Sequence, residues 1–528
     1  MHALIRKMPP LTVAFQALSA LSSAALLTLA LPPYSQSWLA WFALAPWILA
    51  VRQSPTRKSL TVITLLFAFP YHIATLWWIG HVTVLGMVTL CAYLSCYPLL
   101  FAHLIYRPLT NLKILSSFPI LKLSLTAAAL WTVLEWIRSW FLTGFLWNHL
   151  ATTQYLNLAF IQVVAFTGVY GPIFLLVLAN FVLALTLLRL IAEAQRAQPV
   201  RPHLDFSLTF ACIAVCFAIG LRELLTPEDG SGLKPIRIAA VQANIPQEVK
   251  ATRDLTAEEI FEKHVRLTHL ALPLKPDLIL WPETSTGYTL LDLLYTRSQI
   301  FELAQQSDFL FGVLERHYPD KIYNTACLIP RGAKEINAMQ IYRKNHLVMF
   351  GEYTPLAEFF PFLRNLVPYS HDLTAGEEPN LLEAVQGSLR LAPLICFEDV
   401  VPSLVRRFAA LKPQILVNLT NDGWFKDSPG ALQHLANSVF RCIETGLPMI
   451  RSTNTGITAI VSPRGAITHR LTDENGRDVE VEGVLTASLN IRSNPKETFY
   501  TRWGDVFVYG CLLWILLLTL KFSFSPKH

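Results

Sequence analysis

A cysteine, a carboxylate and a lysine, the residue types that acyl transfer at a thiol requires, occur where predicted strands end. Cys396 follows an apolar run in LRLAPLICFEDV (389–400), which predicts a buried strand that ends at polar residues. Glu283 and Lys344 follow other short runs of this kind. Each residue alone has an ordinary explanation, because a free cysteine is usually a small buried hydrophobe and a lone charge is usually solvated.

The sequence around Glu283 and Lys344 strengthens the case for chemistry. In Trp-Pro-Glu-Thr (281–284), Pro282 cannot continue a hydrogen-bonded ladder, so the strand stops and Glu283 projects from its end. In YRKNHLVMFGEYTP (342–355), Lys344 leaves a strand ahead of a segment that reaches Glu352. Together with the cysteine of CFE (396–398), these motifs supply a base, a cation and a nucleophile.

The composition divides the chain into a membrane part and an aqueous part. Hydrophobic residues make up 53% of the 528 residues and charged residues only 15%, which is too apolar for an ordinary soluble enzyme. The apolar runs fill roughly the first 225 residues and return only after Asp505. We therefore expect a transmembrane helix bundle at 1–225, an aqueous domain at 234–501, and a C-terminal transmembrane helix with a short tail at 502–528.

About eight apolar runs are long enough to cross a bilayer as helices, about seven of them before the aqueous domain. The sixth run contains Gly168, Gly171 and Pro172, which predict a short interfacial segment followed by the true span. The predicted spans are Leu11–Ala30, Trp38–Val51, Leu60–Ile79, Val82–Tyr106, Leu121–Phe141, Phe160–Ile191, Phe206–Leu221 and Val506–Leu520.

Lysine and arginine residues gather in alternate loops, and this distribution predicts the orientation of the spans. Basic residues precede the first span and follow the second, fourth, sixth and eighth, whereas the loops 31–37, 80–81 and 143–157 carry none. Because basic loops stay in the cytoplasm, both termini should be cytoplasmic and the aqueous domain should lie outside. The net charge of +6 comes mostly from these loops and does not indicate nucleic-acid binding.

The aqueous domain alternates strand-like and helical runs, as an α/β domain does. The clearest helix is Gly430–Thr445, which has one apolar stripe. Two sheets enclosed between two helix layers would accommodate the pattern. The predicted strands are Ile236–Ala243, Leu278–Trp281, Phe309–Leu314, Thr325–Ile329, Ala338–Tyr342, Leu389–Cys396, Ile415–Leu419, Met449–Arg451, Thr458–Val461 and Val484–Leu489.

The cysteines indicate a free thiol and give no sign of a metal site. Of the eight cysteines, Cys327, Cys396 and Cys442 fall in the aqueous domain, and an odd number leaves at least one thiol unpaired. Neither a CxxC motif nor a Cys/His cluster with zinc spacing occurs, so we expect no metal and no cofactor.

Taken in chain order, WPE (281–283), YRK (342–344) with FGEYTP (350–355), and CFE (396–398) resemble the nitrilase, or carbon–nitrogen hydrolase, superfamily with its Glu-Lys-Cys triad. The segments VQANIPQ (241–247), LTNDGWF (419–425) and RSTNTGITAIV (451–461) extend the resemblance over nearly the whole aqueous domain. The flanking spans make the chain resemble, more narrowly, the bacterial apolipoprotein N-acyltransferases. This resemblance implies a polytopic helical membrane domain joined to a nitrilase-like αββα sandwich.

The resemblance also implies a role for each motif residue. Cys396 would be the nucleophile and Glu283 the base that takes its proton. Lys344 and the backbone N–H of Phe397 would stabilise the negatively charged oxygen that forms during attack. Glu352 would orient Lys344 or share in proton transfer, and CFE adds Glu398 as a supporting residue.

The implied reaction has two halves. An acyl chain passes from a membrane phospholipid to Cys396 as a thioester, and then to the α-amino group of the N-terminal diacylglyceryl-cysteine of an apolipoprotein. The implied location is the bacterial inner membrane with the catalytic domain in the periplasm, and we expect a monomer. A membrane-anchored amide hydrolase of the same superfamily is the alternative, because water could resolve the same thioester. A transporter or scaffold with a degenerate domain is a third, and the intact triad argues against it.

Aromatic residues near the motifs predict contact with lipid. The segment AEFFPFLRNLVPY (357–369) includes Phe359 and Phe360, and we expect it to enter the outer leaflet as a lid, or to plug the domain. Phe397 and Trp424 either line an acyl pocket or belong to the core.

Two positions depart from the family pattern. Met349 stands where relatives often carry proline, which removes a rigid kink but no reactive group. Ala251 stands where some relatives carry a tryptophan in a mobile loop, so gating by an aromatic side chain is in doubt here.

Four polar residues fall within or beside the predicted spans. Glu135 and Arg138 are one helical turn apart, so we expect them to form a neutralising structural pair, although intramembrane charges are often functional. His72 and His81 lie near the predicted outer surface, where they could contact phospholipid headgroups.

Overall fold

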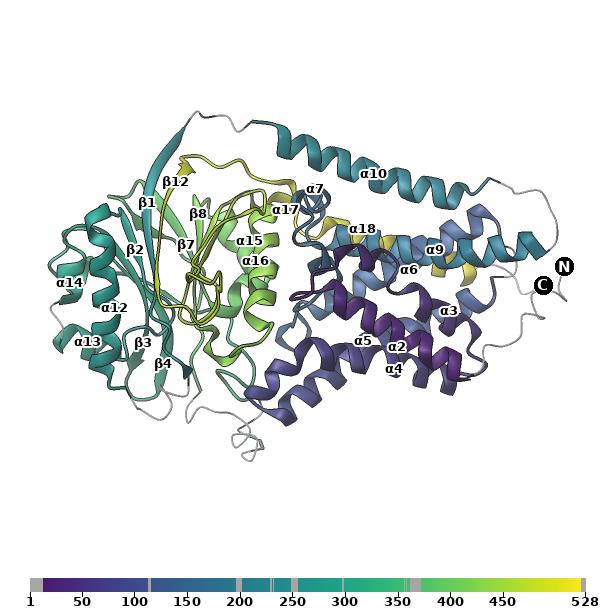
Figure 1. Ribbon diagram of the computed structural model, residues 1–528, viewed down its shortest axis with the longest axis horizontal. Helices are drawn as coiled ribbons and strands as arrows, with labels where there is room; N and C mark the ends of the chain where they lie inside the picture. Colours follow the sequence, from purple (N-terminus) through teal and green to yellow (C-terminus); the bar gives the residue numbers. More distant parts are fainter. Residues whose placement is uncertain are drawn as a thin grey trace. The chain divides into compact units, whose positions relative to one another are not determined.

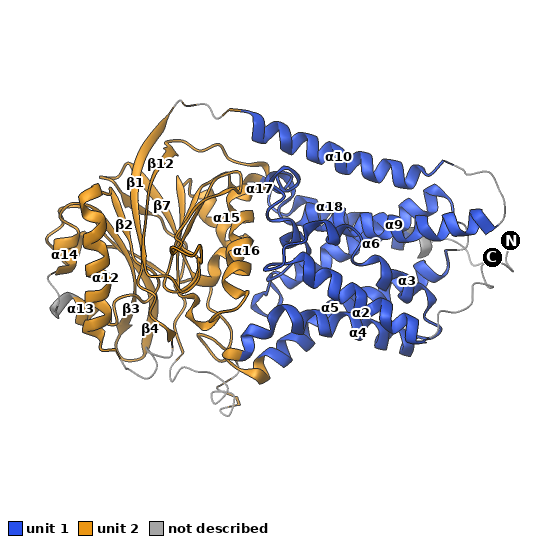
Figure 2. Ribbon diagram, in the orientation of Figure 1, with its two compact units in different colours: residues 1–80, 87–226, 503–528 blue, residues 81–86, 227–502 orange. Residues whose placement is uncertain are grey.

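The computed structural model describes residues 13–112, 115–195, 202–227, 230, 232–247, 255–296, 299–355, 357, 359–360 and 372–523. The chain forms two compact units (Figure 2). The helical unit comprises residues 1–80, 87–226 and 503–528, and the α/β unit comprises residues 81–86 and 227–502.

Within the described residues, six helices of the helical unit are long and apolar enough to cross a membrane. Their exposed side chains include Leu208 and Val215, as expected of helices that face lipid rather than water. Helix α18 (Val506–Ser523), which contains the shorter apolar stretch Val506–Leu520, follows the α/β unit in the chain. The six are α2 (Val13–Ala30), α4 (Arg57–Leu76, extended by the 3-10 turn η2, Trp77–His81), α5 (Val84–Thr110), α6 (Ser117–Arg138), α9 (Tyr170–Gln195) and α10 (Leu204–Leu225).

The predicted second and sixth spans are both interrupted. Trp38–Val51 is not one long helix but the 3-10 turn η1 (Ser37–Trp41) and the nine-residue α3 (Ala45–Gln53). Pro46, at the first turn of α3, has no N–H to continue a helix from the preceding residues. The sixth run divides as predicted: the short helix α7 (Leu158–Ile161) is followed by α8 (Val164–Thr167), and α8 ends at Gly168, which has a φ of +62°.

Buried polar groups hold the interrupted segments in place. Asn180 of α9 donates to the carbonyl of Ala40 and accepts from the N–H of Leu44 at 2.7 Å. One side chain therefore satisfies backbone groups on both sides of the break between η1 and α3, where the helical ladder cannot.

The charged pair predicted in α6 is present. Arg138 Nη2 lies 2.6 Å from Glu135 Oε2, and both side chains are buried. His72 is buried against Ser95, with Nδ1 3.2 Å from Ser95 Oγ, so its ring is not exposed for the headgroup contact that the sequence allowed. His81 is exposed.

The α/β unit contains two six-stranded sheets (Figure 1). Every predicted strand has a counterpart, and β6 and β11 were not predicted because they are short and carry no clear apolar alternation. The first sheet has the order β12 (Gly483–Arg492), β1 (Leu233–Gln242), β2 (Leu278–Leu280), β3 (Asp308–His317), β4 (Lys321–Ile329) and β5 (Gln340–Arg343). The second has the order β11 (Ile467–Arg470), β10 (Ala459–Val461), β9 (Met449–Thr453), β8 (Ile415–Thr420), β7 (Leu389–Ile395) and β6 (Leu382–Ala384).

Helices cover the outer faces of the two sheets, as the predicted sandwich requires. Helix α12 (Ala257–Ala271) contacts β1 and β12, and Phe261 packs edge-on against Trp281. Helices α15 (Pro402–Ala410) and α16 (Gly430–Thr445) lie on the second sheet (Figure 1). The sheets meet where the Ser452 hydroxyl donates to the carbonyl of Val241. The αββα expectation is confirmed.

Candidate active site

The sheet topology brings four polar residues to one edge of the sandwich. Strands β1, β2 and β3 are mutually parallel, and so are β7, β8 and β9, so their carboxyl ends meet at common edges. Strand β5 has the direction of β3, because each is antiparallel to β4. Glu283 follows β2, Lys344 follows β5, Cys396 follows β7 and Thr420 ends β8.

Cys396 begins the 3-10 turn η8 (Cys396–Val400), directly after β7. Its φ of +53° is unusual for a residue with a side chain and costs about 1–3 kcal/mol, so the surroundings must hold the turn in place. The Asn418 side chain does so by donating to the carbonyl of Cys396 at 2.9 Å. The strand therefore ends one residue earlier than predicted, and the cysteine lies on a sharp strained turn.

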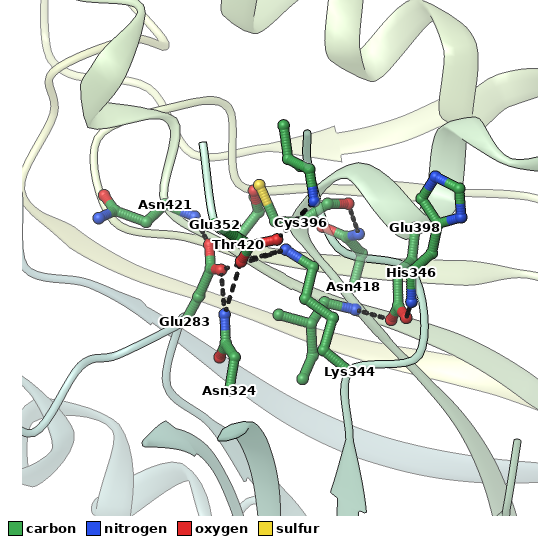
Figure 3. Close-up of polar contacts among 12 residues, drawn as sticks. Glu283, Asn324, Lys344, His346, Glu352, Cys396, Glu398, Asn418, Thr420 and Asn421 are labelled. Carbon is green, nitrogen blue, oxygen red and sulfur yellow. Dashed lines mark hydrogen bonds and ion pairs between the residues drawn. The ribbon is translucent and has the colours of Figure 1, made fainter. Parts of the chain in front are cut away.

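Glu283 is held by two donors, so its carboxylate has a fixed position (Figure 3). Asn324 Nδ2 donates to Oε1 at 2.7 Å, and the backbone N–H of Asn421 donates to Oε2 at 2.8 Å. The turn that carries Glu283 needs the glycine at 312 of β3, because a Cβ there would lie 2.6 Å from the Cα of Glu283.

Lys344 lies between two carboxylates (Figure 3). Its Nζ donates to Glu352 Oε1 at 2.7 Å and lies 3.8 Å from Glu283 Oε1. Glu352 in turn accepts from the backbone N–H of Val348 at 2.9 Å. All three charged residues are buried, so the lysine charge is needed to offset burial of the carboxylates.

Burial and mutual charge shift the pKa values of these groups. Burial raises the pKa of Glu283, and the charge of Lys344 only partly offsets it. Burial alone would lower the pKa of Lys344, but Glu352 and Glu283 outweigh burial and raise it, so the lysine stays protonated. Burial, followed by the charge of Glu283, raises the pKa of the Cys396 thiol. The resting cysteine is therefore a thiol with a raised-pKa carboxylate available as its base.

Glu398, two residues after Cys396, accepts four hydrogen bonds. Its Oε1 accepts from the Tyr342 hydroxyl and from the backbone N–H groups of Asn345 and His346, and its Oε2 accepts from the N–H of Ile395. These bonds tie the segment after Lys344 to the turn that carries the cysteine. Burial raises the pKa of Glu398 to about 7.

The predicted aromatic residues lie in different settings. Phe397 is half-buried, and its ring stacks on that of His346 with centroids 6.0 Å apart. Trp424 is half-buried in the 3-10 turn η9 (Asp422–Trp424). Phe359 and Phe360 are 75% and 50% exposed, whereas residues 361–369 of the expected lid lie outside the described residues, as does Ala251. In the described part of the chain, no group of three or more His, Cys, Asp or Glu residues could hold a metal ion.

Comparisons with known proteins cover both units. The model described as the apolipoprotein N-acyltransferase N-terminal domain matches residues 23–182, and the carbon-nitrogen hydrolase model matches residues 237–493. An apolipoprotein N-acyltransferase from Geobacter metallireducens is 34% identical over 514 residues, which cover 94% of this chain and 93% of that protein. The chain belongs to this family. An apolipoprotein N-acyltransferase from Allorhizobium ampelinum is 30% identical over 519 residues, which cover 91% of each chain.

Membership of the apolipoprotein N-acyltransferase family confirms the resemblance inferred from the motifs. With its long apolar helices, the chain is a bacterial membrane enzyme whose α/β unit is nitrilase-like. The motifs had not pointed to Asn324, Asn418 or Thr420 as parts of the site. Thr420 lies within LTNDGWF, a segment that contributed to the family resemblance. Nothing in that segment indicated that Thr420 lies next to the cysteine.

Proposed function

We propose that this chain transfers a fatty acyl chain from a membrane phospholipid to Cys396, and then to the α-amino group of the N-terminal diacylglyceryl-cysteine of an apolipoprotein. The observation that carries the proposal is the convergence of Glu283, Lys344, Glu352 and Cys396 in one buried site of a membrane enzyme of this family. Because all four groups come from one chain, we expect a monomer to suffice.

In the first half-reaction, Glu283 takes the thiol proton and the Cys396 sulfur attacks the ester carbonyl of the phospholipid. The carbonyl oxygen becomes negatively charged, and Lys344, together with the backbone N–H of Phe397, stabilises it. When the ester C–O bond breaks, the protonated Glu283 returns its proton to the leaving oxygen. A lysophospholipid departs, and the acyl chain stays on sulfur as a thioester.

In the second half-reaction, the α-amino group of the apolipoprotein attacks the thioester carbonyl. Glu283 takes a proton from the attacking nitrogen, the C–S bond breaks and that proton returns to sulfur. The product is an amide and the thiol is restored. Glu352 keeps Lys344 in position through both steps, since it forms the shorter of the two carboxylate contacts with Nζ.

The location of the reaction follows from the charge of the loops. Basic loops alternate with uncharged ones along the spans, which supports cytoplasmic termini and a periplasmic α/β unit in the inner membrane. A site facing the outer leaflet would take its acyl donor directly from the bilayer. The exposed Phe359 and Phe360 supply an apolar surface that favours such contact.

The test uses the purified full chain with phospholipid vesicles and a synthetic diacylated lipopeptide. We expect mass spectrometry to detect triacylated lipopeptide with the wild-type chain and none with Cys396→Ala. Cys212→Ala, which removes an exposed thiol from α10, is the matched control and should retain activity. Triacylated product from Cys396→Ala at the wild-type rate would contradict the mechanism, and free fatty acid as the sole product would indicate hydrolysis.

A further inference from the structure

Behind the cysteine turn lies a cluster of charged residues that the proposed mechanism does not use. His434 of α16 lies between two aspartates: Nε2 is 2.8 Å from Asp399 Oδ1, and Nδ1 is 2.9 Å from Asp422 Oδ1. Arg451 of β9 donates to Asp399 Oδ2, and its Nη2 lies 3.8 Å from Asp422 Oδ2. Each of these residues is at least 98% buried.

The cluster is built around Asp422. The glycine at 456 leaves space for it, because a Cβ there would lie 2.1 Å from Asp422 Oδ2. Since each ring nitrogen of His434 faces a carboxylate oxygen, both nitrogens must carry hydrogen for the two contacts to be hydrogen bonds. Asp399 and Asp422 accordingly outweigh burial and raise the pKa of His434 to about 9. Two carboxylates, an imidazolium and a guanidinium then have no net charge.

The cluster is connected to the nucleophile at two points. Asp399 belongs to η8, the same turn as Cys396, and therefore anchors that turn. Asp422 Oδ1 also accepts from the Thr420 hydroxyl at 3.1 Å, and that hydroxyl is close enough to the Cys396 thiol to lower its pKa against the effect of burial. Figure 3 shows Thr420 beside the cysteine. A continuous path of contacts thus runs from His434 through Asp422 and Thr420 to the sulfur.

A threonine hydroxyl has one hydrogen, so it can donate to only one partner at a time. While Cys396 is a thiol, the hydroxyl donates to Asp422, and the single S–H hydrogen remains available to Glu283. When Glu283 has taken the thiol proton, the sulfur can only accept, and the hydroxyl can turn to donate to it. Asp422 then loses one donor but keeps the one from His434. No covalent bond forms or breaks at Thr420.

We propose that the Thr420 hydroxyl stabilises the Cys396 thiolate, and that His434, fixed between Asp399 and Asp422, permits this by remaining a hydrogen-bond donor to Asp422 when the hydroxyl turns to sulfur. Thr420 is then a catalytic residue, because it contacts the reacting sulfur, and His434 is a positioning residue. The inference deepens the proposed function, on which it rests for the role of Cys396.

The proposal predicts that substitutions in this network change the rate of thiolate reactions at Cys396 in opposite directions. A cluster with only a structural role would not produce opposite changes. Thr420→Val removes the donor and should slow thiolate reactions, whereas Thr420→Ser keeps it. His434→Gln removes the positive charge that offsets the carboxylate of Asp422, so it should also slow the thiolate reactions. Asp422→Asn leaves an uncharged and therefore weaker competing acceptor, and it removes a negative charge that raises the pKa of the thiol, so it should speed these reactions.

The experiment measures alkylation of Cys396 by iodoacetamide between pH 6 and pH 10, on the purified full chain, with site-resolved mass spectrometry. At pH 7 we expect a rate about tenfold lower for Thr420→Val and for His434→Gln, near wild type for Thr420→Ser, and above wild type for Asp422→Asn, since one pKa unit is a factor of ten. His264→Gln, which removes another buried imidazole of the α/β unit, should leave the rate unchanged.

An identical pH profile for Thr420→Val and the wild type would overturn the inference, as would slower alkylation of Asp422→Asn. If His434→Gln fails to fold, the Thr420→Val and Thr420→Ser pair still decides the matter, because neither changes a charge. Alkylation needs no lipid, so it is separate from the proposed function. If acyl transfer occurs but the variants do not show the expected alkylation rates, only this inference is rejected. If the alkylation rates are as expected but no acyl transfer occurs, only the proposed function is rejected.

Discussion

Two buried charged sites of this chain, one in each unit, are built differently. In the helical unit, Glu135 and Arg138 form a one-to-one pair on a single helix, one turn apart. In the α/β unit, Lys344 faces both Glu283 and Glu352, and the three come from separate segments. In a balanced pair each charge is neutralised by the other. One lysine facing two carboxylates leaves a carboxylate incompletely compensated, which suits the role of base that we propose for Glu283.

The largest effect should come from removing the incompletely compensated carboxylate. Glu283→Gln keeps the shape of the side chain but cannot take the thiol proton, so we expect acyl-enzyme formation to slow by about a thousandfold. Single-turnover kinetics with phospholipid as donor would measure it. Glu135→Gln is the control from the other unit, and the rate per folded molecule should match the wild type. Similar slowing by both substitutions would remove the distinction between the two kinds of site.

Removing the lysine should have the next largest effect. Lys344→Met loses the charge that we propose stabilises the oxyanion, and we expect the acylation rate to fall about a hundredfold or more. Because Lys344 lowers the pKa of Glu283 against the effect of burial, its loss should raise that pKa further. Glu283 must be ionised to act as a base, so the acidic limb of the pH–rate profile should move to higher pH. An unshifted limb would show that another group limits the rate at acidic pH.

The pair of the helical unit should affect stability instead of rate. Arg138→Met leaves Glu135 buried without its partner, and we expect a loss of about 3–5 kcal/mol. Glu135→Gln combined with Arg138→Met should recover most of this loss, since no unpaired charge remains. Thermal unfolding in detergent measures both. A double variant no more stable than Arg138→Met would mean that the pair does more than neutralise itself.

Glu398 is a third kind of buried carboxylate, held by neutral donors instead of a lysine. Its pKa is about 7 in the folded chain and lower when unfolded, so between roughly pH 4.5 and pH 7 the folded state binds more protons. Stability from this group is therefore fully present near pH 4.5 and is lost as pH rises to 7, by roughly 3 kcal/mol. The stability advantage of the wild type over Glu398→Gln should shrink across this window. Chemical denaturation at pH 5 and pH 7.5 tests the sign, and a growing advantage would contradict it.

The smallest effect concerns surface contact with lipid. Replacing both Phe359 and Phe360 by serine should lower turnover of phospholipid about threefold or more while leaving a short-chain soluble ester unaffected, since both rings are substantially exposed. Leu270→Ser, at an exposed apolar position on α12, is the matched control. Unchanged phospholipid turnover would reject the lid.

The sequence predicted the strands and the motif residues well because both depend on local pattern. Apolar runs bounded by turn residues identified the strand ends that carry Glu283, Lys344 and Cys396, and the resemblance supplied their grouping. The i,i+3 spacing alone predicted the pair in α6. The second span was mispredicted because hydropathy does not register the helix start at Pro46.

The contacts that complete the site depend on distant segments and could not be read from local pattern. Asn324 is an ordinary strand residue until the pairing of β3, β4 and β5 brings it to Glu283 and Glu352. His434 looked like part of an amphipathic helix, and only the packing of α16 on the cysteine turn gives it two aspartate partners. The burial of His72 could not be read from the sequence for the same reason, because Ser95 comes from another helix.

The central claim is that the sulfur of Cys396 carries the acyl chain covalently between donor and acceptor. The most direct measurement is the intact mass of the chain after incubation with phospholipid and no lipopeptide. We predict a mass increase of one fatty-acyl group, absent in Cys396→Ala and reversed when the diacylated lipopeptide is added. A wild-type mass that never rises, under conditions where the complete reaction forms product, would contradict the account.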